Sequence, residues 1–444
     1  MAPQRPRVVI AGAGFGGLEA AKSLRNSAAD VIVIDRENHH CFQPLLYQVA
    51  TAALSPADVA WPIRRILRKQ KNATVLMAEI RNIDTGKRLV RADLVDVPYD
   101  FLVLATGATH SYFGHDEWAA AAPGLKQIED ATRIRQRILI AFEHAEIASD
   151  EAERRRLLTF VIVGGGATGV EMAGAIAEIA RQTLAMDFRR IDPKTSRIVL
   201  IEAGSRVLPT FPAHLSDYAA RTLTQKGVEV MTSTRVIGVD PRGVDLEAGR
   251  IDAATIIWAA GVVASPGARW LGAVQDRAGR IEVGPDLSVP GHPEIFAIGD
   301  TAALVGQTIP GIAPAAKQMG HYVGELIAAR IAGKPEPPPF RYHHQGDLAT
   351  IGRNAAVVKL GRLELKGFIG WLFWCVIHIL FLIDTRDRVV VALNWLWDYV
   401  TFQRGARLIT QVPPPDGIAN LSVRPRESGD PVPPQRTGFP LPRE

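Results

Sequence analysis

The fold of this chain is decided by residues 8–17, VVIAGAGFGG, whose pattern returns at residues 160–169 as FVIVGGGATG. Each copy consists of an apolar strand, a G-x-G-x-x-G turn and an alanine-rich helical stretch. In such a turn the first glycine permits the tight bend, the second lets the backbone approach a pyrophosphate, and the third allows close helix–strand packing. The start of the helix adds positive partial charge for the phosphates. The chain is therefore predicted to carry two dinucleotide-binding units.

An acidic residue ends the second strand of each unit. Asp35 follows the strand at 31–34 at close to the distance from the glycines expected of a carboxylate that binds a ribose hydroxyl. The alternative is an ordinary glycine turn with a surface aspartate. Glu202 ends the strand at 198–201, so far beyond its glycines that a longer helix and loop are expected between them. Its charge would repel the 2′-phosphate of NADPH and therefore favours NADH. The nearby Arg206 leaves NADPH as an alternative cofactor.

Composition limits the other possibilities. A chain of 444 residues is expected to form two or three domains, and its hydrophobic content of 47% with 22% charged residues is ordinary for a folded protein. The net charge of +5 is modest and no basic run is interleaved with aromatics, so no nucleic-acid partner is expected. The two cysteines, Cys41 and Cys375, are far apart in sequence, which argues against a dithiol, a metal site or a disulfide framework.

The order of motifs predicts domains that are not contiguous in sequence. The apolar residues Val8–Ile10 lead straight into the first glycine motif, so we expect a buried strand there rather than a signal peptide. The proline-rich stretch 334–339 marks a linker, and the segment after Pro413 has the composition of a disordered tail. The predicted parts are a first dinucleotide domain (1–112), a connecting helical segment (113–156), a second dinucleotide domain (157–284), the return of the first (285–333), a C-terminal region (334–412) and the tail (413–444).

Three more strand ends complete a family pattern: FLVLATG at 101–107, IIWAAG at 256–261 and IFAIGD at 295–300. In this order they resemble the flavoproteins with two dinucleotide-binding domains of the glutathione-reductase type. The resemblance implies an α/β fold in which an NADH domain interrupts an FAD domain. It also implies that FAD is bound by Gly12, Gly14, Gly17, Asp35, Gly107 and Asp300. NADH would be bound by Gly164, Gly166, Gly169, Glu202 and Gly261.

One segment narrows the resemblance to a single family. Residues 42–50, FQPLLYQVA, are similar at every position to the segment after the first acidic strand of type II NADH:quinone oxidoreductases. The paired cysteines of the disulfide reductases and sulfide:quinone oxidoreductases are missing. Residues 313–320 resemble the family's quinone-side helix, in which Gln318 matches the second glutamine and Pro314 replaces the first. The resemblance implies a quinone contact for Gln318; the alternative is a solvated helix residue.

Three side chains near these motifs have an ordinary and a functional interpretation. We interpret Cys41 as a small packing residue. His39 and His40 are expected to be polar loop residues rather than metal ligands. Glu171, just past Gly169, is predicted to lie in the first turn of the second helix, near the nicotinamide, and to take part in proton delivery. Its alternative is an acid stabilised by the helix dipole.

The C-terminal region holds two apolar segments, residues 367–383 and 389–402. The first would make a helix of roughly 25 Å, which is shorter than a bilayer core. Three aromatic residues in the second suit a membrane interface, and two arginines beyond it could meet anionic headgroups: Trp395, Trp397, Tyr399, Arg404 and Arg407. We therefore expect two helices that lie on a lipid surface, with the protein peripheral on the cytoplasmic side of the inner membrane. A homodimer interface and a buried core helix remain alternatives.

The family implies a reaction. NADH would pass a hydride to FAD, and the reduced flavin would pass two electrons to a membrane quinone, without proton pumping. One alternative is an NADH-dependent reductase of a soluble carrier or of oxygen. Another is a non-catalytic flavoprotein that senses NADH.

Overall fold

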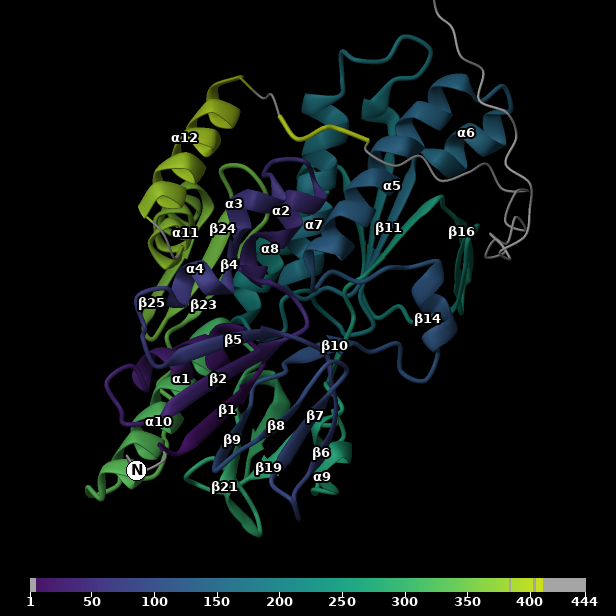
Figure 1. Ribbon diagram of the computed structural model, residues 1–444. Helices are drawn as coiled ribbons and strands as arrows, with labels where there is room; N and C mark the ends of the chain where they lie inside the picture. Colours follow the sequence, from purple (N-terminus) through teal and green to yellow (C-terminus); the bar gives the residue numbers. More distant parts are fainter. Residues whose placement is uncertain (1–4, 383–384, 402–404, 410–444) are drawn as a thin grey trace, which may run out of the picture. The chain divides into compact units, whose positions relative to one another are not determined.

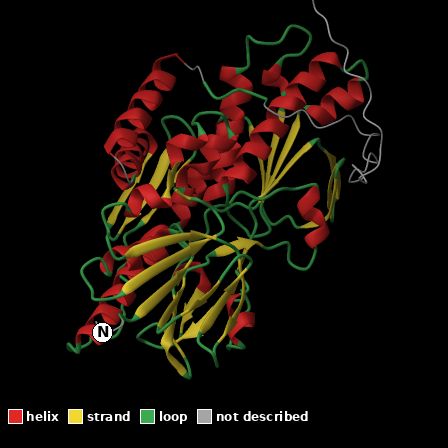
Figure 2. Cartoon of the chain, in the orientation of Figure 1, coloured by secondary structure: helices red, strands yellow, loops and turns green. Residues whose placement is uncertain are grey.

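Two mainly parallel sheets, each containing the strand of one glycine motif, organise the chain (Figure 1 and Figure 2). The structure is a computed structural model that describes residues 5–382, 385–401 and 405–409. The described residues up to Leu408 form one compact unit, and of residues 409–444 only Ile409 is described. The predicted disordered tail, 413–444, lies outside the described residues.

The first sheet contains strands from both ends of the chain. Its order is β20-β21-β9-β1-β2-β5, and all neighbours are parallel except β20 and β21. The strands are β1 (Arg7–Ala11), β2 (Asp30–Asp35), β5 (Ala73–Met77), β9 (Phe101–Leu104), β20 (Ser288–Val289) and β21 (His292–Ala297). The two middle strands are apolar apart from Arg7, which begins β1, as expected of parallel strands covered on both faces. Since β21 pairs with β9, the second domain interrupts the first, as predicted.

The helix after the first glycine motif packs on a helix from the returning segment. α1 (Phe15–Ser23) contacts α10 (Ala313–Ala332) along its length. The contact requires glycine, because a Cβ atom on Gly320 would lie 2.1 Å from the Gly16 carbonyl oxygen. Backbone therefore meets backbone between these two helices, which fixes the helix that carries Gln318 against the first glycine loop.

The second sheet has the order β13-β12-β11-β17 and is entirely parallel. Its strands are β11 (Thr159–Val163), β12 (Arg197–Ile201), β13 (Val228–Met231) and β17 (Thr255–Trp258), and its main helices are α5 (Ile128–Ile147), α7 (Ala167–Glu178) and α8 (Ala213–Gln225). A π-helical turn, Ile179–Thr183, and a loop with a short 3-10 turn, Pro193–Thr195, separate α7 from β12. This insertion is the longer connection that the wide spacing before Glu202 predicted.

The chain returns to the first domain earlier than the sequence indicated. α9 (Gly267–Leu271) and β19 (Ile281–Val283) place Ala268, Ile281 and Val283 in the core of the first domain. β19 also pairs with β22 (Ala302–Leu304), which follows the first sheet's last strand. The expected boundary at 284/285 is therefore too late, because the elements on both sides of it belong to the first domain.

Smaller elements join and cover the two domains. They are β3 (His39–Cys41) with β4 (Ala60–Pro62), β6 (Ile80–Asp84) with β7 (Leu89–Ala92) and β8 (Asp96–Pro98), β10 (Ala108–His110) with β18 (Val262–Ala264), β14 (Val236–Asp240) with β15 (Gly243–Leu246) and β16 (Gly249–Asp252), and the helices α2 (Leu46–Ala50), α3 (Pro56–Val59), α4 (Ile63–Leu67) and α6 (Glu151–Leu157). The C-terminal region is an antiparallel sheet of β23 (Asp347–Thr350), β24 (Ala356–Leu360) and β25 (Leu363–Lys366), followed by α11 (Gly367–Phe381) and α12 (Thr385–Thr401).

Candidate functional site

The first glycine loop has the geometry of a pyrophosphate cradle. Gly12 has φ +101°, and a Cβ atom there would lie 2.4 Å from the Ala105 carbonyl oxygen. A Cβ on Gly17 would lie 1.9 Å from the Gly12 carbonyl oxygen, whereas one on Gly14 would meet nothing within 4 Å. The first and third glycines are therefore required by packing, and the second leaves open space. That is the space a dinucleotide pyrophosphate needs at the start of α1.

The second loop repeats this arrangement. Gly164 has φ +110°, a Cβ on Gly169 would lie 1.8 Å from the Gly164 carbonyl oxygen, and Gly166 has open space. The chain thus presents two equivalent loops, each at the carboxyl end of a central parallel strand and the start of a helix.

The two predicted ribose acids occupy equivalent positions. Asp35 accepts a hydrogen bond from the Ala13 backbone N–H (2.6 Å), and Glu202 accepts one from the Gly165 backbone N–H (2.6 Å). Ala13 and Gly165 are the middle residues of the two G-x-G turns, so each carboxylate lies against its own loop. Burial raises the pKa of Asp35, while backbone hydrogen bonds oppose this effect. Arg206 donates to the Pro209 carbonyl oxygen (3.0 Å).

The remaining predicted FAD residues meet where the chain crosses between domains. Gly107 has φ +70°, and its N–H donates to the Thr301 hydroxyl (2.9 Å). Asp300 lies in a 3-10 turn and lines a cavity of about 110 Å³, and its carboxylate is 3.6 Å from the Lys126 ammonium. Gly261 follows β17, and its carbonyl accepts a hydrogen bond from the Ser111 N–H (3.1 Å). Lys126 is a charged residue beside the predicted flavin site that no motif indicated.

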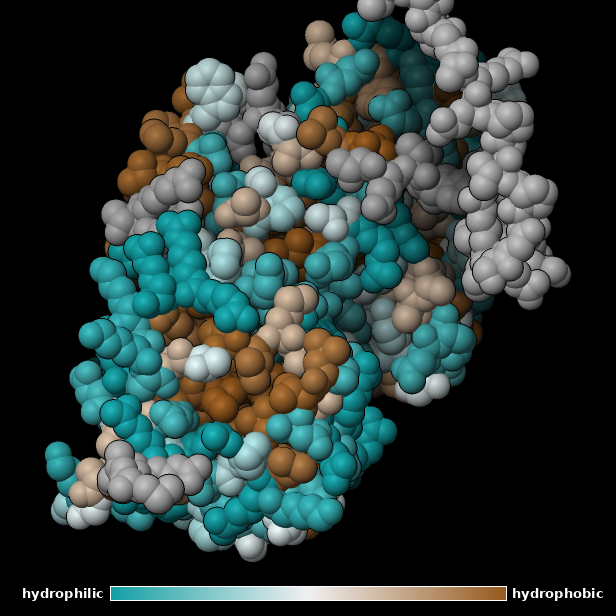
Figure 3. All heavy atoms as spheres, viewed as in Figure 1, coloured by the Kyte–Doolittle hydropathy of each residue, from teal (hydrophilic) through white to brown (hydrophobic). Residues whose placement is uncertain are grey.

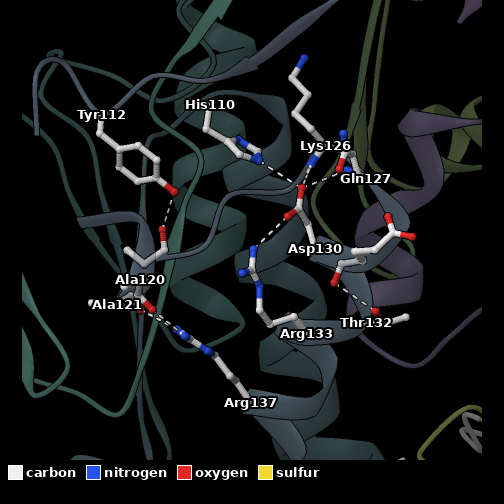
Figure 4. Close-up of polar contacts among 12 residues, drawn as sticks. His110, Tyr112, Ala120, Ala121, Lys126, Gln127, Asp130, Thr132, Arg133 and Arg137 are labelled. Carbon is white, nitrogen blue, oxygen red and sulfur yellow. Dashed lines mark hydrogen bonds and ion pairs between the residues drawn. The ribbon is translucent and has the colours of Figure 1, made fainter. Parts of the chain in front are cut away.

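The crossing itself is held by a polar cluster that sequence reasoning missed (Figure 4). The Asp130 carboxylate accepts hydrogen bonds from the backbone N–H groups of Lys126 (3.0 Å) and Gln127 (3.1 Å) at the start of α5. It also contacts His110 Nε2 (3.1 Å) and Arg133 (3.0 Å). His110 ends β10, which pairs with β18, so the cluster fixes the crossing strands to the second domain. An acid at the third position of a predicted helix is a capping signal and could have indicated it.

Glu171 lies in a different place from the one predicted. The first turn of α7, from Ala167 to Val170, carries no acid, and Glu171 begins the second turn. Its side chain faces the C-terminal sheet, where Oε1 accepts a hydrogen bond from the Thr350 N–H (3.4 Å). The residue is 9% exposed, and burial raises the pKa of its carboxyl to about 8. The carboxyl therefore holds a proton near neutral pH, and the first-turn dipole interpretation is wrong.

The FQPLLYQVA segment connects this acid to the C-terminal helices. Burial raises the pKa of the Tyr47 hydroxyl well above its usual value, and the nearby charge of Glu171 contributes. Gln48 donates to the Tyr47 hydroxyl (2.9 Å) and accepts a hydrogen bond from the indole N–H of Trp395 (2.7 Å). Tyr47 also meets Trp374 edge-on, with ring centroids 6.4 Å apart. The segment that matched the family most closely thus forms a buried contact with α11 and α12.

His39 and His40 were predicted to be polar loop residues, and this is wrong, because both lie in strand β3. His40 is 2% exposed, and its Nδ1 is 3.0 Å from the Ala13 carbonyl oxygen of the first glycine loop. Burial lowers the pKa of His40 to about 4, so the ring is neutral at physiological pH. Burial also raises the pKa of the neighbouring Cys41 thiol to about 12, which suits the predicted packing role.

The side-chain amide of Gln318 is hydrogen-bonded to the backbone of His343. Its amide nitrogen donates to the His343 carbonyl oxygen (2.9 Å), and its amide oxygen accepts from the His343 N–H (3.0 Å). These bonds join α10 to the segment after the proline-rich linker. Pro314 lies in the first turn of α10, as predicted for a proline that preserves the helix. A quinone contact for Gln318 remains a prediction.

The aromatic residues of α12 are divided between two sides. Trp395 stacks on Trp374 (5.4 Å), and Tyr399 stacks on Trp371 (5.5 Å), so both face α11. The chain thus pairs them with aromatic residues of the neighbouring helix, and their predicted place at a membrane interface stays a prediction. Trp397 alone of the three is largely exposed (62%).

Two arginines after α12, Arg404 and Arg407, were predicted to meet anionic lipid headgroups. Arg407 forms an ion pair with Asp187, and its predicted role at lipid headgroups stays a prediction. Arg404 lies outside the described residues.

Comparisons with known proteins agree with this geometry. The pyridine nucleotide-disulphide oxidoreductase family matches residues 6–320, and the NDH2 C-terminal domain matches residues 344–403. Type II NADH:quinone oxidoreductase Ndh of Mycobacterium tuberculosis is 45% identical, over 92% of this chain and 91% of that protein. NdhA of the same organism is 44% identical, over 91% and 90%. The structure of NDH2 from Plasmodium falciparum in complex with NADH has the same fold, with a TM-score of 0.83 at 22% identity over 92% of this chain and 100% of that chain.

Proposed function

The chain belongs to the type II NADH:quinone oxidoreductase family, and we propose that it oxidises NADH and reduces a quinone through bound FAD. One observation carries the proposal: two glycine loops of the same geometry, each with an acid against its middle residue, lie in a single chain. One dinucleotide can then be retained as a cofactor while the other is exchanged as a substrate. The flavin, when bound, supplies the exchange of a hydride for two electrons.

The residues of the first domain fit FAD. The open face at Gly14 and the start of α1 receive the pyrophosphate, and Asp35 is placed for the adenosine ribose. Gly107 and Asp300 lie beside the cavity at the crossing, which suits the ribityl chain. Glu202 at the second loop favours NADH, because a 2′-phosphate would meet a carboxylate already held in place.

The reaction consumes one proton, because NADH, H⁺ and a quinone give NAD⁺ and a quinol. Glu171 is proposed to relay it, on the quinone side rather than the nicotinamide side. Its carboxyl is buried, protonated near pH 7 and near Tyr47, and a residue with a pKa near the working pH can both give and receive a proton. The buried indole N–H of Trp374, beside Tyr47, has no hydrogen-bond partner among the described residues and is a candidate donor to a quinone carbonyl.

The outer faces of α11 and α12 are proposed to bind the lipid surface. Exposed apolar side chains recur at helical spacing on both helices: Ile369, Leu372, Val376 and Leu380 on α11, and Val389, Leu393, Leu396 and Val400 on α12. Hydrophobic residues gather at the upper left of Figure 3, where Figure 1 places α12. Within the described ranges, no helix is both long and apolar enough to span a bilayer. Two helices lying on one leaflet match this pattern, and we propose attachment to the cytoplasmic side of the inner membrane.

The decisive experiment is NADH oxidation by the purified protein in liposomes against a panel of quinones. We expect the flavin to bleach with NADH and to be reoxidised rapidly by a quinone. If NADH bleaches the flavin but oxygen or a soluble carrier reoxidises it faster than every quinone, the proposed acceptor is wrong. A homodimer remains a proposal for the same apolar face, and a dimer in solution that dissociates when liposomes are added would separate the two uses.

A further inference from the structure

Phe113 combines exposure with an unfavourable backbone. Its φ is +54°, in the left-handed region that residues with a side chain rarely occupy, and the next residue, Gly114, has φ +95°. The phenylalanine ring is nevertheless 67% exposed, so it contributes little to a core that would repay the strain. Strained residues of this kind cluster at ligand-binding sites, where the conformation itself serves the function.

The ring rests on one of the predicted NADH residues. A Cβ atom on Gly261 would lie 2.7 Å from Phe113 Cζ, so the ring covers the Cα face of this glycine. Gly261 does not have a left-handed φ, so its backbone does not require glycine. Its lack of a side chain instead leaves room for the Phe113 ring. The Ser111–Gly261 backbone hydrogen bond (3.1 Å) and the neighbouring Trp258 ring (6.3 Å between centroids) hold the two segments together.

The sheet order shows which part of NADH would lie there. A dinucleotide crosses the carboxyl edge of the sheet, with its pyrophosphate at the glycine loop and its adenine ribose at the acid that ends the next strand. Here the loop follows β11 and the acid, Glu202, follows β12, so the adenosine half lies on the β12 side. The nicotinamide half must then extend to the other side of β11, where β17 ends and Gly261 follows.

We propose that Phe113 is a nicotinamide-positioning residue whose exposed ring packs against the nicotinamide riboside of NADH. This inference rests on the proposed function, in that the second glycine loop binds NADH. An aromatic face suits a planar heterocycle, and it excludes water from the region through which the hydride must pass. The strained backbone holds the ring at the edge of the sheet, where it packs against the Cα atom of Gly261.

The test measures NAD⁺ affinity, by equilibrium titration of the oxidised holoenzyme, alongside NADH reduction of the flavin by rapid mixing. Phe113→Ala and Phe113→Gly should raise the dissociation constants of NAD⁺ and of NADH roughly 3- to 10-fold, the range that an aromatic contact supports. Phe113→Tyr should keep the wild-type values. FAD content should not change, and chemically reduced enzyme should be reoxidised by quinone at the wild-type rate. Phe113→Gly should fold at least as well as the wild type, because glycine accepts the left-handed backbone.

A double-mutant cycle separates contact from general damage. Gly261→Ala alone should displace the Phe113 ring and weaken NAD⁺ binding. The same substitution should weaken NAD⁺ binding less when it is made in the Phe113→Gly variant. Leu94→Ala, at another largely exposed apolar residue, is the matched control and should change nothing. Wild-type NAD⁺ affinity in Phe113→Gly, with normal flavin reduction, would overturn the inference and leave the proposed function intact. If NADH fails to reduce the wild-type flavin, the proposed function itself fails.

Discussion

Replacing Glu171 by glutamine should stabilise the protein, and the gain should depend on pH. In the folded state burial raises the pKa of this carboxyl to about 8, against an ordinary value of 4.5. Between these values the folded protein keeps a proton that the unfolded chain loses. The contribution of Glu171 to stability is therefore complete below pH 4.5 and falls as the pH rises, until the folded carboxyl ionises near pH 8. Glutamine does not titrate and can still accept the hydrogen bond from Thr350.

The magnitude follows from the two pKa values. Each pH unit of the interval corresponds to about 1.4 kcal/mol, so the wild type should lose about 4 kcal/mol relative to Glu171→Gln between pH 5 and pH 8. This is a large part of the free energy of unfolding of a typical protein. Urea unfolding of the FAD-loaded wild type and variant at several pH values, followed by tryptophan fluorescence, measures the difference directly. The two curves should diverge from pH 5 to pH 8 and run parallel above it.

A constant difference over this range would refute the reasoning, because it would mean that Glu171 titrates alike in the folded and unfolded states. A matched control is Glu229→Gln, which removes an exposed acid that forms an ion pair with Arg197 on the surface. It should show no comparable divergence. Glu171→Gln also tests the proposed proton relay, because it should slow quinone reduction while NADH still reduces the flavin.

Three further predictions concern the other parts of the site. Glu202→Gln should narrow the preference for NADH over NADPH severalfold, mainly through the apparent KM for NADPH in steady-state assays, and equal use of both cofactors by the wild type would contradict it. Asp35→Asn should weaken FAD binding about 10-fold in fluorescence titrations of the apoprotein, by losing the charged partner of the adenosine ribose. Leu393→Glu, on the exposed face of α12, should reduce liposome binding in flotation assays without changing the melting temperature, whereas unchanged flotation would leave that face to a protein partner.

The parts of the fold that the sequence predicted are those that depend on local rules. Gly12 and Gly164 need left-handed backbone, and Gly17 and Gly169 need the absence of a Cβ atom, so the residue type alone indicates the loop. The two acids follow because a parallel strand must end at the same sheet edge as the loop. The interrupted order of domains also followed from motif order.

What the sequence could not indicate depends on contacts between distant residues. Trp395 resembles an interfacial aromatic in sequence, but its indole N–H is bonded to Gln48, in a segment at the opposite end of the chain. His40 resembles a loop histidine until its contact with the first glycine loop is known. Hydropathy cannot distinguish the buried side of α12 from its exposed side when both are aromatic and apolar. Deleting the chain from Gly367 would therefore remove Trp374 and expose the core residues against which it packs. Single substitutions on the outer face are the cleaner test of membrane binding.

The stretch from His40 to Gln48, which includes most of the FQPLLYQVA segment, contacts three separate parts of the chain. His40 contacts the backbone of the first glycine loop, while Gln48, a few residues later, contacts Trp395 of α12. Between them, Gln43 donates to the Lys126 carbonyl oxygen (3.2 Å), and Lys126 in turn pairs with Asp300. One short segment thus connects the FAD loop, the domain crossing and the helices proposed to meet the lipid. Because these contacts share one short stretch of backbone, the side chains that make them must fit their three partners at the same time.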